Sequence, residues 1–102
     1  MSSSTTARPP VEVSIVVPLY NEEESVQPLY ERITEAAASM GRSYEILLVN
    51  DGSRDRTLEI ATGLAMRDPR LKVIDFRGNY GQTPAMAAGI DHARGQFVVT
   101  MD

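Results

Sequence analysis

The feature that most constrains the fold of this chain is a β-branched apolar run at residues 15–17, which ends at a proline. The run lacks a helical period, which favours a strand buried on both faces of a parallel sheet covered by helices. Pro18 has no N–H to donate to a neighbouring strand, so it marks the end of the strand. Open α/β sheets bind ligands at the carboxyl ends of strands, beside the strand where the strand order reverses. The polar residues Tyr20, Asn21 and Glu22 are therefore placed where a ligand would be expected.

Strand-like apolar runs alternate with helical segments along the rest of the chain. Further strands are predicted at residues 44–50, 71–76 and 97–101, and helices from Glu24 or Ser25 to residue 40 and at residues 56–67 and 85–94. Alternating apolar and polar residues in the third strand are typical of an outer strand. The β-α-β-α-β-α-β order with right-handed crossovers predicts an α/β fold, a three-layer sandwich with a parallel sheet.

Capping residues indicate where two of the helices begin and end. Asp55 or Ser53 is placed to cap the second helix. Thr83 as a cap, followed by Pro84 at the first helical position, predicts the start of the third helix. Gly95 is expected to end that helix.

Composition excludes several classes of protein. The net charge of -4 argues against a nucleic-acid partner, and the absence of cysteine excludes disulfides and thiolate metal sites, as fits a cytoplasmic protein. No apolar run approaches the roughly 20 residues that cross a bilayer. The G-x-G-x-x-G fingerprint of nicotinamide and flavin enzymes is absent. Residues 1–10 are expected to form a flexible tail, and residues 11–102 the folded part.

Polar groups also follow later strands of the predicted sheet. Asp51 follows the second strand, and Asp102 follows the fourth. By spacing alone, Asp51 is somewhat better explained as a turn former than as a carboxylate that binds a base or sugar hydroxyl. Residues 20–22 have a similar alternative as solvated or capping groups. Asn79 and Gly81 precede a helix start, where backbone N–H groups can hold a phosphate. The convergence of residues 20–22, Asp51 and Asp102 at one sheet edge favours a binding site.

Four segments together resemble the family 2 glycosyltransferases of GT-A fold in order and spacing. They are residues 18–23, 49–57, 79–81 with 85–89, and 101–102. Within that family, the chain is most similar to the polyprenyl-phosphate hexosyltransferases, which include dolichol-phosphate mannose synthase and bacterial undecaprenyl-phosphate glucosyltransferases. The resemblance covers residues 13–102 and implies the Rossmann-like nucleotide-binding half of a GT-A fold.

The resemblance implies a nucleotide-sugar site with a metal ion and no assigned catalytic residue. The implied substrate-binding residues are Pro18, Tyr20, Asn21 and Glu22 around the base and ribose, Asp51 on the base, and Asn79 and Gly81. Asp102 matches the first aspartate of the D-x-D motif, which holds Mg²⁺ or Mn²⁺ on the diphosphate. Such an ion takes oxygen ligands and substrate phosphates, and neutralises charge on the leaving nucleoside diphosphate.

The implied reaction transfers a hexose from a UDP- or GDP-sugar, of the UDP-glucose or GDP-mannose type, to a polyprenyl phosphate with inversion. Such a reaction belongs to cell-envelope glycan synthesis. The second D-x-D aspartate and the acceptor half are expected beyond residue 102, so this chain would hold the donor-binding part and would not transfer sugar alone. The parent enzyme is expected at the cytoplasmic face of the membrane, which it would contact through later segments.

Two other functions fit parts of the pattern. A non-catalytic α/β nucleotide-binding module would keep the pocket without the chemistry, and an x-Asp continuation after Asp102 would favour the enzyme instead. A phospho-receiver signalling domain shares the β/α order. It requires paired acidic residues at the end of the first strand, where this chain has Pro18, Leu19 and Tyr20. We therefore set the receiver aside.

Overall fold

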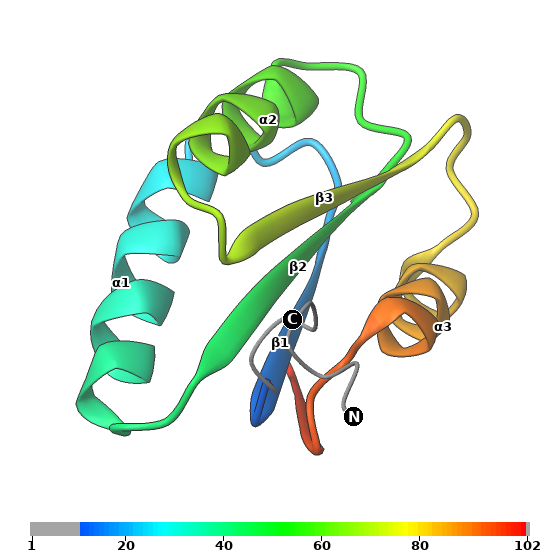
Figure 1. Cartoon of the computed structure of the whole chain (residues 1–102). Helices are drawn as coiled ribbons and strands as arrows, with labels where there is room; N and C mark the ends of the chain where they lie inside the picture. Colours follow the sequence, from blue (N-terminus) through cyan, green and yellow to red (C-terminus); the bar gives the residue numbers. More distant parts are fainter. Residues whose placement is uncertain (1–10, 102) are drawn as a thin grey trace, which may run out of the picture.

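A computed structural model describes residues 11–101 of the chain as a parallel sheet with helices on both faces (Figure 1). The elements are β1 (Val13–Leu19), α1 (Val26–Ser39), β2 (Tyr44–Asp51), α2 (Thr57–Arg67), β3 (Leu71–Phe76), α3 (Gln82–His92) and β4 (Phe97–Thr100). Helices α1 and α2 cover one face of the sheet and α3 covers the other. The predicted α/β sandwich is confirmed, whereas the predicted tail at residues 1–10 lies outside the described residues.

The strand order β3-β2-β1-β4 places β1 where the order reverses. Both central strands, β1 and β2, are buried along nearly their whole length. Their parallel register pairs Ile15 with Ile46 and Val17 with Leu48, so these four side chains contribute to the core under α1 and α2. The outer strand β3 is only half-buried, which its alternating pattern predicted. The carboxyl ends of β1, β2 and β3 meet at one edge of the sheet.

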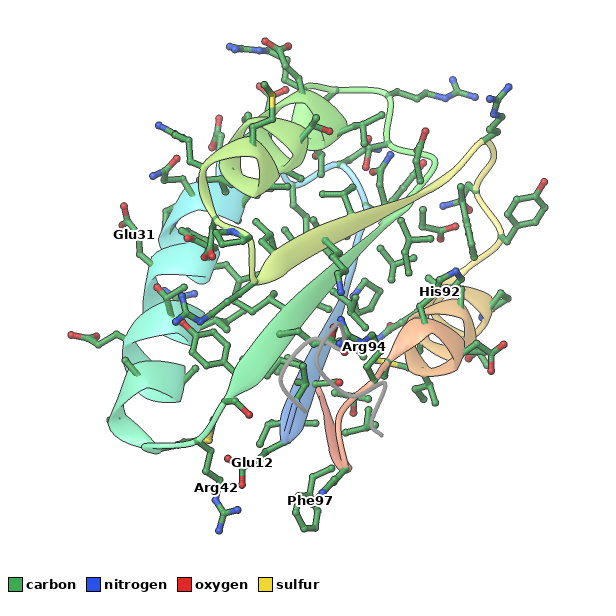
Figure 2. The ribbon with its side chains drawn as sticks, in the orientation of Figure 1. Glu12, Glu31, Arg42, His92, Arg94 and Phe97 are labelled. Atoms are coloured by element: carbon green, nitrogen blue, oxygen red, sulfur yellow. The ribbon has the colours of Figure 1, made fainter. Side chains whose placement is uncertain are left out.

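Helix α3 packs closely on the opposite face because small residues form its inner side. A Cβ added at Gly89 would lie 2.2 Å from Cγ1 of Val16, so only glycine fits at this contact. Ala85 is fully buried in the small apolar cluster between α3 and the sheet. Strand β4 lies beside β1 at the sheet's edge, and its side chains, including that of Phe97, are exposed (Figure 2).

The predicted boundaries of α3 are wrong at both ends. The helix begins at Gln82 with Gly81 as its N-cap, so Thr83 lies inside the first turn instead of capping it. Pro84 is tolerated at the third helical position because the N–H groups of the first turn need no intrahelical acceptor. The helix ends at His92 because the chain turns extended at Ala93, and Gly95 instead lets the backbone pass Ser14 closely.

A buried carboxylate joins four elements near the amino end of the sheet. Oε2 of Glu45 accepts hydrogen bonds from Oγ of Ser14 at 2.6 Å and from the Arg94 N–H at 2.7 Å. Oε1 accepts one from Nζ of Lys72 at 3.2 Å. Burial alone would raise the pKa of Glu45, but these three donors outweigh it and hold the pKa below the usual value. The cluster ties β1, β2 and β3 to the connection that leads from α3 into β4.

We expect Glu45→Gln to flatten the dependence of stability on pH in the acid range. Because the folded-state pKa of Glu45 is lowered, its stabilisation is complete above the unfolded-state value of 4.5 and is lost as the pH falls through the folded-state pKa. Urea unfolding between about pH 3 and pH 7 measures this. Glu31→Gln is the control, because Glu31 is exposed on the outer side of α1 (Figure 2). Parallel pH curves for Glu45→Gln and the unchanged chain would contradict the assignment.

Within residues 11–101, none of the helices combines the length and apolar character that a membrane span requires.

Candidate functional site

A cavity of about 360 Å³ opens at the carboxyl edge of the sheet. It is lined by Pro18, Leu19, Tyr20, Glu22, Asp51, Asn79, Gly81 and Gln82. Every predicted substrate-binding residue except Asn21 is therefore in its lining. The predictions did not include Leu19 or Gln82, and no sequence signal marked either residue. Asp102, the predicted metal ligand, lies outside the described residues.

The Asp51 carboxylate holds one wall of this cavity. Oδ1 accepts a hydrogen bond from the Tyr80 N–H at 2.8 Å, and Oδ2 accepts one from the Gly81 N–H at 2.9 Å. Nδ2 of Asn79 lies 3.2 Å from Oδ2. These partners are 28 to 30 residues away in sequence, so Asp51 organises a distant loop and is not a local turn former. A carboxylate accepts about four hydrogen bonds, which leaves an acceptor position on Oδ1 for a ligand.

The loop after β2 and the loop before α3 are in close backbone contact next to Asp51. Gly52 has φ +70°, and a Cβ there would lie 2.5 Å from the carbonyl carbon of Gly78. Gly81 has φ +101°, a conformation that glycine adopts readily, and it is the N-cap of α3 at the cavity wall. The positive end of the α3 dipole is thereby directed to the same space, where it favours an anion.

The β1–α1 loop supplies the facing wall. Tyr20 is 44% exposed, and its N–H donates a hydrogen bond to Oε2 of Glu22 at 3.1 Å. Between these two residues, Asn21 has φ +50° and does not line the cavity. Its side-chain Oδ1 accepts a hydrogen bond from the Arg54 N–H in the β2–α2 loop. The prediction that Asn21 contacts a ligand remains a prediction.

A second hollow of about 580 Å³ adjoins the first and shares Tyr20 and Asn79 with it. Nδ2 of Asn50 donates a hydrogen bond to Asp75 at 3.0 Å across the ends of β2 and β3. Among the described residues, Oδ1 of Asn50 is the buried side-chain atom without a hydrogen-bond partner. Arg54 and Arg77 also line this hollow and give it a cationic rim.

Over residues 11–101, the structure contains no cluster of three or more His, Cys, Asp or Glu side chains that could hold a metal ion. Two carboxylates line the cavity, those of Glu22 and Asp51, and that of Asp51 is occupied by the loop of Asn79, Tyr80 and Gly81.

Comparison with known proteins gives one family. The model of glycosyl transferase family 2 matches residues 14–102. Dodecaprenyl-phosphate galacturonate synthase of Rhizobium johnstonii is 47% identical over 93 residues, which cover 90% of this chain and 28% of that protein. The chain spans about 28% of the length of the curated relatives it matches.

Solved structures with the same arrangement include two with bound nucleotides. A crystal structure of S. aureus TarS 1–349 in complex with UDP has a TM-score of 0.73 and 27% identity, over 90% of this chain and 27% of that one. The mannosyltransferase PcManGT of Pyrobaculum calidifontis, in complex with GDP-Man and Mn²⁺, has a TM-score of 0.72 and 25% identity, over 91% and 27% respectively.

Proposed function

This chain belongs to glycosyl transferase family 2, and from that premise we propose that its carboxyl-edge cavity binds the nucleotide of a nucleotide-sugar donor. The observation that carries the proposal is the cavity itself, because Tyr20 and Glu22 form one wall, and Asp51 with the start of α3 forms the other. A volume of about 360 Å³ is within the usual range for small-ligand sites. The solved structures with UDP and with GDP-Man support this choice of ligand class.

Each wall has a defined role in the proposal. The Tyr20 ring and Pro18 provide an apolar surface for the base, and the remaining acceptor position on Asp51 takes an N–H of the base. Glu22 accepts hydrogen bonds from ribose hydroxyls. The diphosphate lies towards Gly81 and the positive end of α3. In this proposal, the residues of this chain bind and orient the donor.

We further propose that the parent enzyme uses Mg²⁺ or Mn²⁺, held by Asp102 and the donor's phosphates. When bound, the ion neutralises the charge that develops on the leaving nucleoside diphosphate. The oxygen atoms of Asp102 and of the phosphates suit such an ion, because phosphate and carboxylate oxygens are the ligands that Mg²⁺ and Mn²⁺ prefer. The complex of PcManGT with Mn²⁺ supports a metal at such a site.

The proposed acceptor is a polyprenyl phosphate, by analogy with the dodecaprenyl-phosphate galacturonate synthase. A lipid phosphate is already anionic at neutral pH, so its oxygen can attack the anomeric carbon in line and invert it without a strong general base. Contact with the lipid is proposed for parts of the parent enzyme outside this chain, at the cytoplasmic face of the membrane. By itself, the chain would bind the donor without transferring sugar.

Calorimetric titration of the chain with UDP and GDP, each with and without Mn²⁺, tests the proposal. We expect saturable binding of one nucleotide with a Kd roughly tenfold or more below that of the other, because a base-contacting site discriminates between bases. ADP serves as the control ligand, and circular dichroism confirms that the chain is folded. Equal, weak signals for UDP, GDP and ADP would contradict a donor site.

A further inference from the structure

The loop after β1 and the loop after β2 are joined by an unusually regular set of hydrogen bonds. Three consecutive backbone N–H groups of the first loop donate to three side chains of the second. The Asn21 N–H donates to Oγ of Ser53 at 2.9 Å, and the Glu22 N–H donates to Oγ1 of Thr57 at 2.8 Å. The next N–H, that of Glu23, donates to Oδ2 of Asp55 at 3.2 Å.

The second loop also donates hydrogen bonds to the first. The Arg54 N–H donates to Oδ1 of Asn21 at 2.8 Å, and the Arg56 N–H donates to Oε1 of Glu23 at 2.9 Å. Side chains and amides thus alternate along residues 53–57, so that each residue of this segment bonds the loop after β1. We call this set of hydrogen bonds the loop clasp.

Helix capping does not account for these contacts. Oδ1 of Asp55 accepts the Thr57 N–H at 2.9 Å in a local turn before α2, but the N-cap is Arg56 and no side chain caps the helix, so the prediction that Asp55 or Ser53 caps α2 is wrong. Ser53, the other predicted cap, bonds Asn21 instead. Burial acts to raise the pKa of Asp55, but hydrogen bonds from Thr57 and Glu23 outweigh it and hold the pKa below the usual value. The clasp bonds span 32 to 35 residues of sequence, a distance that no local cap requires.

The clasp connects the two walls of the cavity. Tyr20 and Glu22 line the cavity, whereas Asn21 between them bonds the β2–α2 loop. That loop begins at Asp51, which forms the opposite wall. The distance between the walls is therefore set by side chains that do not line the cavity.

We infer that Asn21, Ser53, Asp55 and Thr57 are positioning residues, which set Tyr20 and Glu22 against Asp51 for donor binding. The inference rests on the proposed function. Among the four, Thr57 is fully buried, and its hydroxyl both accepts the Glu22 N–H and donates to Asp55. Because Thr57 is the most enclosed of the four residues, water cannot take the place of its hydroxyl unless the loops rearrange.

Two substitutions at Thr57 separate positioning from stability. Thr57→Val keeps the shape but removes the hydroxyl and both of its hydrogen bonds, and we expect the Kd of the bound nucleotide to rise roughly tenfold. Thr57→Ser keeps the hydroxyl and removes a buried methyl group, so it lowers stability but leaves the Kd within about twofold. Ser14→Ala is the control, because it removes another buried hydroxyl at the opposite edge of the sheet.

All variants are titrated with the nucleotide that binds the unchanged chain, at a temperature where each is folded. If Thr57→Val does not fold, Asn21→Gly replaces it, because glycine accommodates the φ of +50° and removes the side chain whose Oδ1 accepts the Arg54 N–H. If the variant that is measured binds the nucleotide as tightly as the unchanged chain does, the inference is overturned but the proposed function is not. Equal losses of affinity in Ser14→Ala and Thr57→Val also overturn it, since stability would then explain both. Absence of binding to the unchanged chain overturns the proposed function and the inference together.

Discussion

Replacing Gly52 with alanine is expected to lower the free energy of unfolding by about 3 kcal/mol or more, and to abolish measurable nucleotide binding. The new Cβ would lie 2.5 Å from the Gly78 carbonyl carbon and 2.7 Å from the Asn79 nitrogen. Both are backbone atoms, so no side chain can rotate away. The loop that Asp51 holds would have to move, and with it the wall formed by Asn79 and Gly81.

Two other glycines provide matched controls for this prediction. Gly41 has nearly the same φ, +69°, but a Cβ there would meet no atom within 4 Å, so Gly41→Ala isolates the backbone strain, about 1 kcal/mol. Gly63 lies inside α2 with open space around it, and Gly63→Ala should raise stability by roughly 0.5 to 1 kcal/mol. Denaturant unfolding measures all three. Equal losses at Gly52 and Gly41 would show that the loop contact contributes nothing.

Asp51→Asn is expected to lower the free energy of unfolding by about 3 kcal/mol, because an amide nitrogen would face donors that a carboxylate now satisfies. The N–H groups of Tyr80 and Gly81 would lose a charged acceptor. We expect their amide proton resonances to shift, and the nucleotide Kd to rise by roughly tenfold or more. Both effects follow from the same displaced loop.

Asp75→Asn is the matched control for Asp51→Asn. Asp75 is exposed at the end of β3, where an asparagine oxygen can still accept from Nδ2 of Asn50. We expect a change in stability within about 0.5 kcal/mol and an unchanged nucleotide Kd. If Asp51→Asn behaves like Asp75→Asn in both measurements, the Asp51 carboxylate does not organise the cavity wall.

The order of elements and the edge that carries the site could be predicted because their signals are local. Residues 15–17 and 46–49 are apolar without alternation, and both belong to central strands buried on two faces. Pro18 lies inside β1, which ends at Leu19, so the predicted end of the strand is one residue early, and the polar residues after the strand reach the expected edge. The position of β1 at the reversal of strand order follows from the short parallel crossovers, which leave few alternative topologies.

The start of α3 could not be predicted because a distant side chain determines it. Thr83 followed by Pro84 is a strong local start signal. Asp51 instead binds the N–H groups of Tyr80 and Gly81, which fixes the chain so that the helix begins at Gln82. Tertiary hydrogen bonds here outweigh the capping preference.

The role of the residues around Asn21 was missed for a similar reason. Ser53 and Asp55 are common helix-capping types, and local spacing assigns them to α2. Their bonds to Asn21 and Glu23 join segments more than 30 residues apart, so only the folded chain reveals them. Asn21 tolerates its φ of +50° better than most residues, which was the one local sign of a special backbone position.

We propose that a nucleotide binds between Tyr20 and the loop of Asn79 and Gly81. Amide NMR of the chain, titrated with UDP and then with GDP, tests this placement residue by residue. We predict saturable shifts at residues 20–22, 51 and 79–82 with one of the nucleotides, and unchanged resonances around Glu45 at the opposite edge. Shifts that gather elsewhere, or a well-dispersed spectrum that neither nucleotide alters, would contradict the claim.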